Sequence, residues 1–200
     1  AAADGQPGVS TIKGHTAYEP HPRIPEMPGA PPIVHSWPDE KELAAMQEDI
    51  RALREKIDIL ILYCHWGVSG SQEVAEYQTA IGHAAIDAGV DLIIGSHPHV
   101  PQGVEIYKNK VIFYSLGNFM FGWQKRSAAH PEGLLVRCTV RNNALTKVSF
   151  APIWRNEKGQ PQILPTTDPK GTSIVRTIQK LSASQELKVL EQEVVAWSLA

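Results

Sequence analysis

The sequence predicts an α/β protein: a mixed β-sheet with flanking helices. Apolar runs at residues 57–62 and 92–94 are rich in β-branched residues and are typical of buried strands. A helical pattern lies between them, and strand, helix and strand with short connections form a βαβ unit whose strands are parallel. Two later pairs of strand-like runs, each joined by a short polar turn, predict hairpins that make the sheet mixed.

Prolines recur in the first part of the chain, from Pro20 to Pro38. Because proline fixes φ and removes a backbone donor, we expect residues 4–38 to form a long loop on the surface. A short strand at residues 9–12 is expected to lead into this loop. Loops of this length in compact domains are usually functional or disordered.

Helical spacing begins after this loop. The segment from Ser36 to Asp39 fits a capping pattern, and a proline suits a first turn. Apolar residues then recur at spacings of three and four and form one core-facing stripe, namely Leu43, Met46, Ile50, Leu53 and Ile57. A second helix is expected at residues 73–88, ended by Gly89 with a positive φ. Two terminal helices are expected at residues 174–181 and 185–199.

The expected hairpins follow the βαβ unit. Residues 104–107 and 111–114 flank a turn at residues 108–110, and residues 134–140 and 147–154 flank a turn at residues 141–143. Alternation of apolar and polar residues with a period of two supports the second pair.

Three histidines stand just beyond the two strands of the βαβ unit. His65 follows the first, and His97 and His99 follow the second. Ligand sites in open α/β sheets form at the carboxyl ends of strands, and imidazoles that converge there commonly bind metal ions. We therefore expect the three rings to meet, with alternate residues of an extended loop pointing the same way. His83, in the middle of a helix, is expected to be structural or exposed.

Composition excludes several classes of protein. The net charge of −2, without a basic patch interleaved with aromatics, gives no support to nucleic-acid binding. No apolar run is long enough for a membrane span. Cys64 and Cys138 show no CxxC spacing, so neither a disulfide framework nor a thiolate zinc site is indicated, and a single bridge stays open. Core packing is the preferred interpretation of Cys64.

Several short motifs follow one another between residues 57 and 121. They are His65-Trp66-Gly67, Gln78, Asp87-Ala88-Gly89-Val90-Asp91-Leu92-Ile93-Ile94-Gly95, His97-Pro98-His99-Val100 and Tyr114-Ser115-Leu116-Gly117-Asn118-Phe119. On these motifs the chain resembles the CapA family of capsule and poly-γ-glutamate synthesis proteins, whose fold is similar to that of calcineurin-like metallophosphoesterases. Residues 57–121 are then the motif-bearing core of one CapA-like domain that spans residues 1–200.

The resemblance implies a four-layer sandwich, incomplete in this chain, and a site for one or two divalent metal ions, Mn, Zn or Fe. Its ligands among these residues would be His65, His97 and His99. Nitrogen ligands are expected at about 2.0–2.2 Å from the ion.

The resemblance also implies a substrate pocket that Trp66, Ser115 and Asn118 line. Two alternatives stay open. Gly117 and Asn118 could simply make a turn, and Trp66 could close the pocket wall and exclude water.

The chain departs from the family pattern in two places. Residues 68–70 stand where the family tends to have a glutamate, so Glu73 or Glu76 could replace it only if the loop bends back. The upstream Asp-x-His, Gly-Asp-x-x-Asp and Asn-His motifs are absent. We therefore expect the C-terminal portion of a CapA-like domain, with a missing N-terminal half or a companion chain as its partner.

The function that the resemblance implies is metal-dependent hydrolysis of a phosphoester or related bond, in the synthesis or export of capsular or poly-γ-glutamate polymer. The alternative is a non-catalytic envelope assembly protein that binds an anionic polymer. An extracytoplasmic, cell-envelope location is implied, although no signal segment stands at the start of the sequence. Without a bridging aspartate, we expect this chain alone to bind at most one metal ion and to show no turnover.

Overall fold

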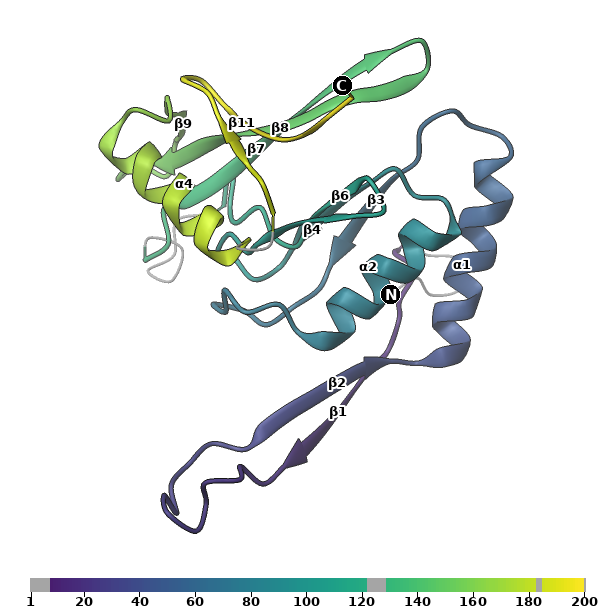
Figure 1. Ribbon diagram of the computed structural model, residues 1–200, viewed down its shortest axis with the longest axis vertical. Helices are drawn as coiled ribbons and strands as arrows, with labels where there is room; N and C mark the ends of the chain where they lie inside the picture. The colour runs from purple at the N-terminus through teal and green to yellow at the C-terminus, as the bar shows by residue number, and fades with distance from the viewer. Residues whose placement is uncertain (1–7, 122–128, 183–184, 200) are drawn as a thin grey trace.

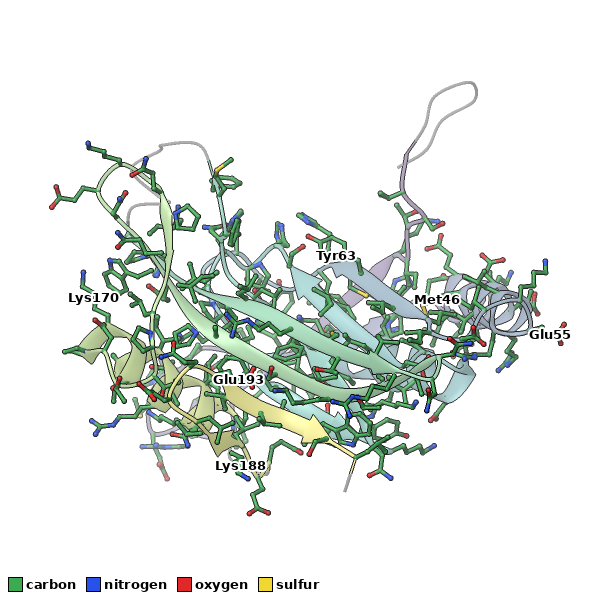
Figure 2. All side chains as sticks on the ribbon, turned by 90° about the horizontal axis from the view of Figure 1, so that it is seen from above. Met46, Glu55, Tyr63, Lys170, Lys188 and Glu193 are labelled. Atoms are coloured by element: carbon green, nitrogen blue, oxygen red, sulfur yellow. The ribbon has the colours of Figure 1, made fainter. Side chains whose placement is uncertain are left out.

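The computed structural model describes residues 8–121, 129–182 and 185–199. These residues form a four-stranded sheet, a five-stranded sheet and a separate two-stranded hairpin, with helices packed against the sheets (Figure 1). Seen from above, α1 with Met46 and Glu55 lies at one end of the molecule, and Lys170 lies at the other (Figure 2). The expected α/β class with a mixed sheet and flanking helices is confirmed.

The mixed sheet carries the motif-bearing strands. In the order β3-β4-β6-β5, its members are β3 (Ile61–His65), β4 (Leu92–Ser96), β6 (Lys110–Phe113) and β5 (Val104–Tyr107). The first three are parallel, and β5 is antiparallel to β6. The βαβ unit and the first hairpin are therefore confirmed, although β3 begins at Ile61 and not at residue 57. As the edge strand, β3 leaves Ile61 and Tyr63 exposed.

The second sheet is antiparallel throughout. Its order is β10-β11-β8-β7, with β9 also paired to β8, and its members are β7 (Glu132–Arg141), β8 (Ala144–Arg155), β9 (Pro161–Ile163), β10 (Lys188–Val189) and β11 (Val194–Ser198). The expected second hairpin is β7–β8. Its turn residues Asn142 and Asn143 have φ of 49° and 60°, a conformation that asparagine tolerates better than most residues.

An apolar core joins the two sheets and α4 (Pro169–Leu181). Phe113 of the mixed sheet meets Phe150 of the second sheet edge to face, with ring centroids 6.1 Å apart. Ile178 of α4 is fully buried in the same cluster. The helix starts at Pro169 because Asp168 caps it, accepting hydrogen bonds from the amides of residues 170 and 171.

The opposite face of the mixed sheet is covered by α1 (Glu40–Arg54) and α2 (Glu76–Ala88). The apolar stripe of α1 faces the core through Ile50, with Leu43 and Met46 packed beside it, but Leu53 is exposed and Ile57 lies beyond the end of the helix. The cap is Asp39, so α1 begins later than a cap at Ser36 would require. The expected positive φ of Gly89 at the end of α2 is confirmed at 124°.

Residues 4–38 were expected to form a long surface loop with a short strand at residues 9–12 leading into it, and this is wrong in part. The structure has an antiparallel hairpin of β1 (Gly14–Glu19) and β2 (Ile33–Pro38) that projects from the body (Figure 1). The strand expected at residues 9–12 is absent from this described stretch. The prolines from Pro20 to Pro32 lie in the connection between the two strands, and Pro38 ends β2. The clustering of prolines therefore predicted the connection correctly but not the strands on either side of it.

The helix expected at residues 185–199 is also wrong. The described residues form β10 and β11, and β11 pairs with β8. Val194 and Ala196 are buried whereas their neighbours are less so, which is the alternation of a strand. Glu193 fixes this register through hydrogen bonds from Lys147 and from Ser149, the latter at 2.6 Å.

Candidate functional site

The three predicted histidines lie together at the carboxyl edge of β3 and β4. His65 ends β3, and the parallel register places it opposite Ser96, one residue before His97. His65 Nε2 is 3.0 Å from His97 Nδ1, with ring centroids 4.7 Å apart. The rings of His97 and His99 are 5.8 Å apart. Strand order and register therefore bring the rings into one histidine cluster.

An extended backbone was expected for the histidine loop, residues 97–99, and this is wrong. His97 has φ of 97° and His99 of 64°. Among the described residues, every other non-glycine residue with positive φ lies in a hairpin turn. Such a conformation costs about 1–3 kcal/mol per residue and persists where the surroundings impose it, often at functional sites.

Asn118 and Ser115 impose this loop conformation on one side. Asn118 Nδ2 donates to the His99 carbonyl at 3.4 Å, and Asn118 Oδ1 lies 2.9 Å from His99 Nδ1. With the amide oriented in this way, Nδ1 of His99 is the donor and its Nε2 is unprotonated. Ser115 Oγ donates to the Val100 carbonyl at 2.7 Å. The edge of the Phe121 ring contacts the imidazole of His99, with centroids 4.9 Å apart.

The structure places the three expected substrate-contacting residues in supporting positions. Trp66, Ser115 and Asn118 are only 6%, 1% and 7% exposed. Trp66 donates from Nε1 to the carbonyl of Tyr114 at 2.8 Å and packs in the core. This position agrees with the alternative that Trp66 closes the pocket wall and excludes water. Their burial leaves little surface for a substrate, so direct contact by these side chains is not what the geometry favours.

A buried pair of glutamines links the segment that follows the histidine loop to the segment before α2. Gln78 and Gln102 have no exposed surface, and Gln78 Nε2 donates to Gln102 Oε1 at 3.1 Å. Gln102 Nε2 in turn donates to the carbonyls of Ser71 and Glu73. Sequence reasoning did not assign this role, because glutamine is mostly an exposed residue. The presence of Gln78 among the ordered motifs was the available signal.

The electrostatics of the cluster favour the neutral form of His97. Burial is the main cause that lowers the pKa of His97, and repulsion from His65 and His99 adds to it. Glu76 does not bend back towards the cluster, since its carboxylate binds the Ser36 amide and His35 of β2. Cys64 is a free thiol whose pKa burial raises to about 12, as expected for a core residue and not for a nucleophile.

The residues of the cluster fit part of a metal site. The 3.0 Å between His65 Nε2 and His97 Nδ1 equals the spacing of adjacent ligands at a right angle with bonds of about 2.1 Å. Within the described parts of the chain, however, no group of three or more histidine, cysteine, aspartate or glutamate residues is arranged to hold a metal ion. The arrangement therefore fits two ligands of one ion, and not a two-metal centre with a bridging carboxylate.

Comparison with known sequences gives one consistent result. The sequence matches the family described as "Bacterial capsule synthesis protein PGA_cap" over residues 5–123. It is 36% identical over 107 residues to "Capsule biosynthesis protein CapA" of Bacillus anthracis, covering 52% of this chain and 25% of that protein. It is 32% identical over 133 residues to "PGA biosynthesis protein CapA" of Bacillus subtilis, covering 66% of this chain and 34% of that protein.

A third relative is the "Probable polyglutamine synthesis accessory protein" of Mycobacterium tuberculosis. It is 39% identical over 61 residues, which are 30% of this chain and 16% of that protein. The chain thus spans about a third or less of the length of these relatives. None of the helices described in the structure is long and apolar enough to cross a membrane.

Proposed function

The chain belongs to the bacterial capsule synthesis protein family PGA_cap, the CapA family, and on that premise we propose that its histidine cluster works in the synthesis or export of capsular or poly-γ-glutamate polymer. The location proposed for this work is the cell envelope, outside the cytoplasmic membrane. One observation carries the proposal: His65 Nε2 and His97 Nδ1 face each other at 3.0 Å, at the sheet edge where ligand sites form.

We propose that His65 and His97 hold one divalent ion, Mn, Zn or Fe, and that His99 is the nearest further ligand. When bound, such an ion supplies Lewis acidity and lowers the pKa of a water molecule. The chain's own residues provide the orientation. Asn118 holds the ring of His99 through Nδ1, and the lowered pKa of His97 favours the neutral ring, which has one nitrogen able to ligate.

Charge supports an ion in this place. Poly-γ-glutamate is a polyanion. Neutral imidazoles carry no charge, and the protein has a net charge of −2. A polyanion therefore needs a positive group at this site, which one divalent ion would supply. Among the residues that the structure describes, no carboxylate hydrogen-bonds to the cluster, so more of the ion's charge stays available to the polymer.

Hydrolysis of a phosphoester or related bond is the catalytic form of this proposal. It requires carboxylates that the histidine cluster does not contain, and we assign them to a companion segment or chain. The described chain alone would then bind one ion weakly and show no turnover.

A non-catalytic assembly protein that binds an anionic polymer is the second candidate. The observation that favours it is the lack, among the residues that the structure describes, of a three-ligand group able to hold a metal. In this case polymer binding would persist in the presence of a chelator.

The test is calorimetric titration of the 200-residue chain with Zn²⁺ or Mn²⁺ at pH 7.5, followed by titration with poly-γ-glutamate with and without a chelator. His97→Ala should abolish ion binding. His21→Ala, a histidine change in the connection of the β1–β2 hairpin, is the matched control and should leave it intact. Binding should weaken below about pH 6, because protonated imidazole cannot ligate.

Each outcome separates the candidates. Ion binding that depends on His97, together with polymer binding that a chelator removes, supports the metal-centred function. Polymer binding that a chelator leaves unchanged supports the assembly function. Ion affinity that is flat from pH 5 to 8, tight binding of two ions per chain, or measurable hydrolysis of a chromogenic phosphodiester by this chain would contradict the assignment.

A further inference from the structure

The hydroxyl of Ser96 lies where three groups of β3 converge. Its Oγ is 2.7 Å from the Tyr63 hydroxyl, 3.3 Å from the carbonyl oxygen of Cys64 and 3.3 Å from His65 Nδ1. The parallel register that places Ser96 opposite His65 produces this convergence. Ser96 is therefore the polar side chain that contacts the first ring of the histidine cluster on the side away from His97.

Proton counting assigns the role of each group. A serine hydroxyl has one proton to donate and two lone pairs to accept with. The Tyr63 hydroxyl donates to Ser96 Oγ, and Ser96 Oγ donates its single proton to the Cys64 carbonyl. Towards His65, Ser96 Oγ can then only accept, so the ring proton sits on Nδ1. The Nε2 of a neutral imidazole with a protonated Nδ1 carries a lone pair, which in the metal-free chain accepts from His97 Nδ1 at 3.0 Å.

We infer that Tyr63 and Ser96 are positioning residues that fix His65 in its Nδ1–H tautomer and keep its Nε2 open to a ligand. That nitrogen faces His97 Nδ1 at 3.0 Å, the contact on which the proposed function rests. In metal sites, a hydrogen bond to the second ring nitrogen sets the tautomer, orients the ring and raises ligand basicity. The identity of the ligand rests on the proposed function, whereas the tautomer is a property of the chain without any ligand.

The position of Tyr63 agrees with this role. It is a large ring on the edge strand that stays 66% exposed, and its hydroxyl donates to Ser96 Oγ at 2.7 Å. Its hydroxyl anchors Ser96 Oγ beside His65 Nδ1, and without this donor the Ser96 side chain is free to rotate away from the ring, which removes the acceptor that favours a proton on Nδ1. That rotation would favour the opposite tautomer, with the ring proton on Nε2 and the ligand position blocked.

The test is two-bond ¹H–¹⁵N spectroscopy of the metal-free chain with ¹⁵N-labelled histidine, at about pH 8 where an imidazole of ordinary pKa is neutral. The wild-type chain should show His65 with a protonated Nδ1. Ser96→Ala and Tyr63→Phe should shift it towards the Nε2–H form, and Ser96→Thr should retain the wild-type pattern because it keeps the hydroxyl. Tyr18→Phe, an equally exposed tyrosine of the hairpin, is the matched control.

Backbone amide spectra establish that each variant is folded. If Ser96→Ala is not, Tyr63→Phe and Ser96→Thr decide the question alone. A wild-type His65 with its proton on Nε2 overturns the inference. So does an unchanged tautomer in folded variants that lack either hydroxyl.

Zn²⁺ titration of the same variants separates this inference from the proposed function. Ser96→Ala should lose about tenfold or more in affinity, the usual cost of removing such a partner. A chain that keeps the expected tautomer but binds no Zn²⁺ supports the positioning roles and overturns the proposed function. Equal Zn²⁺ affinity in wild type and Ser96→Ala, despite a changed tautomer, overturns the positioning roles and leaves the proposed function standing.

Discussion

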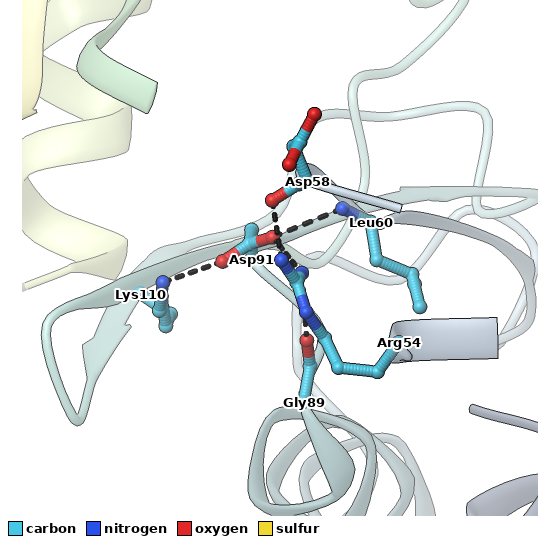
Figure 3. Close-up of polar contacts among 6 residues, drawn as sticks. All are labelled: Arg54, Asp58, Leu60, Gly89, Asp91 and Lys110. Atoms are coloured by element: carbon cyan, nitrogen blue, oxygen red, sulfur yellow. Dashed lines mark hydrogen bonds and ion pairs between the residues drawn. The ribbon is translucent and has the colours of Figure 1, made fainter. Parts of the chain in front are cut away.

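Asp91 holds together the edge of the mixed sheet opposite the histidine cluster (Figure 3). Its carboxylate accepts hydrogen bonds from Arg54 Nη1 at 2.5 Å, from the Leu60 amide at 2.9 Å and from Lys110 Nζ at 2.6 Å. These partners belong to the end of α1, the segment before β3 and the start of β6. One side chain therefore fixes three segments at the start of β4, and we predict that Asp91→Ala destabilises the fold.

The expected loss follows from the exposure of each partner. The side chains of Arg54 and Lys110 are 32% and 41% exposed, so water replaces much of what each ion pair gives, and about 0.5 kcal/mol is lost for each. Leu60 is 5% exposed, and leaving its amide without an acceptor costs about 1–2 kcal/mol. The free energy of unfolding should fall by about 2–3 kcal/mol in total.

The loss should also depend on pH. Burial raises the pKa of Asp91, but hydrogen bonds from Lys110, the Leu60 amide and Arg54 outweigh it, so the net direction is downward. A carboxylate with a lowered pKa stabilises the fold above its unfolded-state pKa of about 3.9, and this contribution disappears as pH falls through the folded pKa. The difference between wild type and Asp91→Ala should be complete at pH 7 and shrink below about pH 4.

Urea unfolding followed by tryptophan fluorescence measures both quantities. Asp87→Ala is the matched control, because Asp87 pairs at 2.6 Å with Lys108 through side chains that are 40% and 61% exposed. Its unfolding midpoint should move far less. Equal losses in the two variants, or a loss for Asp91→Ala that is the same at pH 7 and pH 3.5, would refute the reasoning.

Three further predictions concern other parts of the fold. Gly89→Val should lower the free energy of unfolding by about 1 kcal/mol or more, because a β-branched side chain is strained at a φ of 124°; an unchanged melting temperature would contradict this. Hydrogen bonds with Glu19 and Glu76 raise the pKa of His35. The ion pairs by which His35 joins β2 to α2 are therefore fully formed below about pH 6.5 and weaken as pH rises through the raised pKa. Hydrogen exchange of β1 and β2, corrected for its intrinsic rate, should therefore rise with pH in wild type and not in His35→Gln. Ile61→Lys should reduce self-association in light scattering, because β3 is an edge strand whose Ile61 is 51% exposed.

The part of the fold that sequence could predict is the part with a clear period. Apolar, strand-like runs before His65 and before His97 with a helical pattern between them leave little choice of topology, so the parallel pair and the site edge follow. Their burial was predicted less well, because β3 is an edge strand with Ile61 and Tyr63 exposed. Turn chemistry does the same for the β7–β8 hairpin, where two asparagines take positive φ. The C-terminal segment failed because residues 185–199 have a mixed pattern, and only pairing with β8 selects a strand.

The positions of the three histidines of the candidate site were predictable, but the contacts that support them were not. A histidine directly after a strand is visible in a sequence because strand and residue are adjacent. The partners of Ser96, His99 and Gln102 lie between 19 and 33 residues away along the chain and meet them only through the fold. Nothing local in the sequence marks such a hydrogen bond, so the contacts of Ser115 and Asn118 with the histidine loop could not be predicted, and their expected contact with substrate stays a prediction.

The positive φ of His97 and His99 explains why so many buried polar groups surround so short a motif. Each strained residue costs on the order of 1–3 kcal/mol, which a surface loop would relieve by changing conformation. Here the Asn118 side chain accepts and donates at His99, and Gln102 ties the next turn to the segment before α2. A net hydrogen bond contributes about 1 kcal/mol, so several are needed to offset two strained residues. The mixed sheet, the glutamine pair of Gln78 and Gln102, and the segment after β6 that carries Ser115 and Asn118 therefore act together to hold the imidazoles of two neighbouring strand ends in one place.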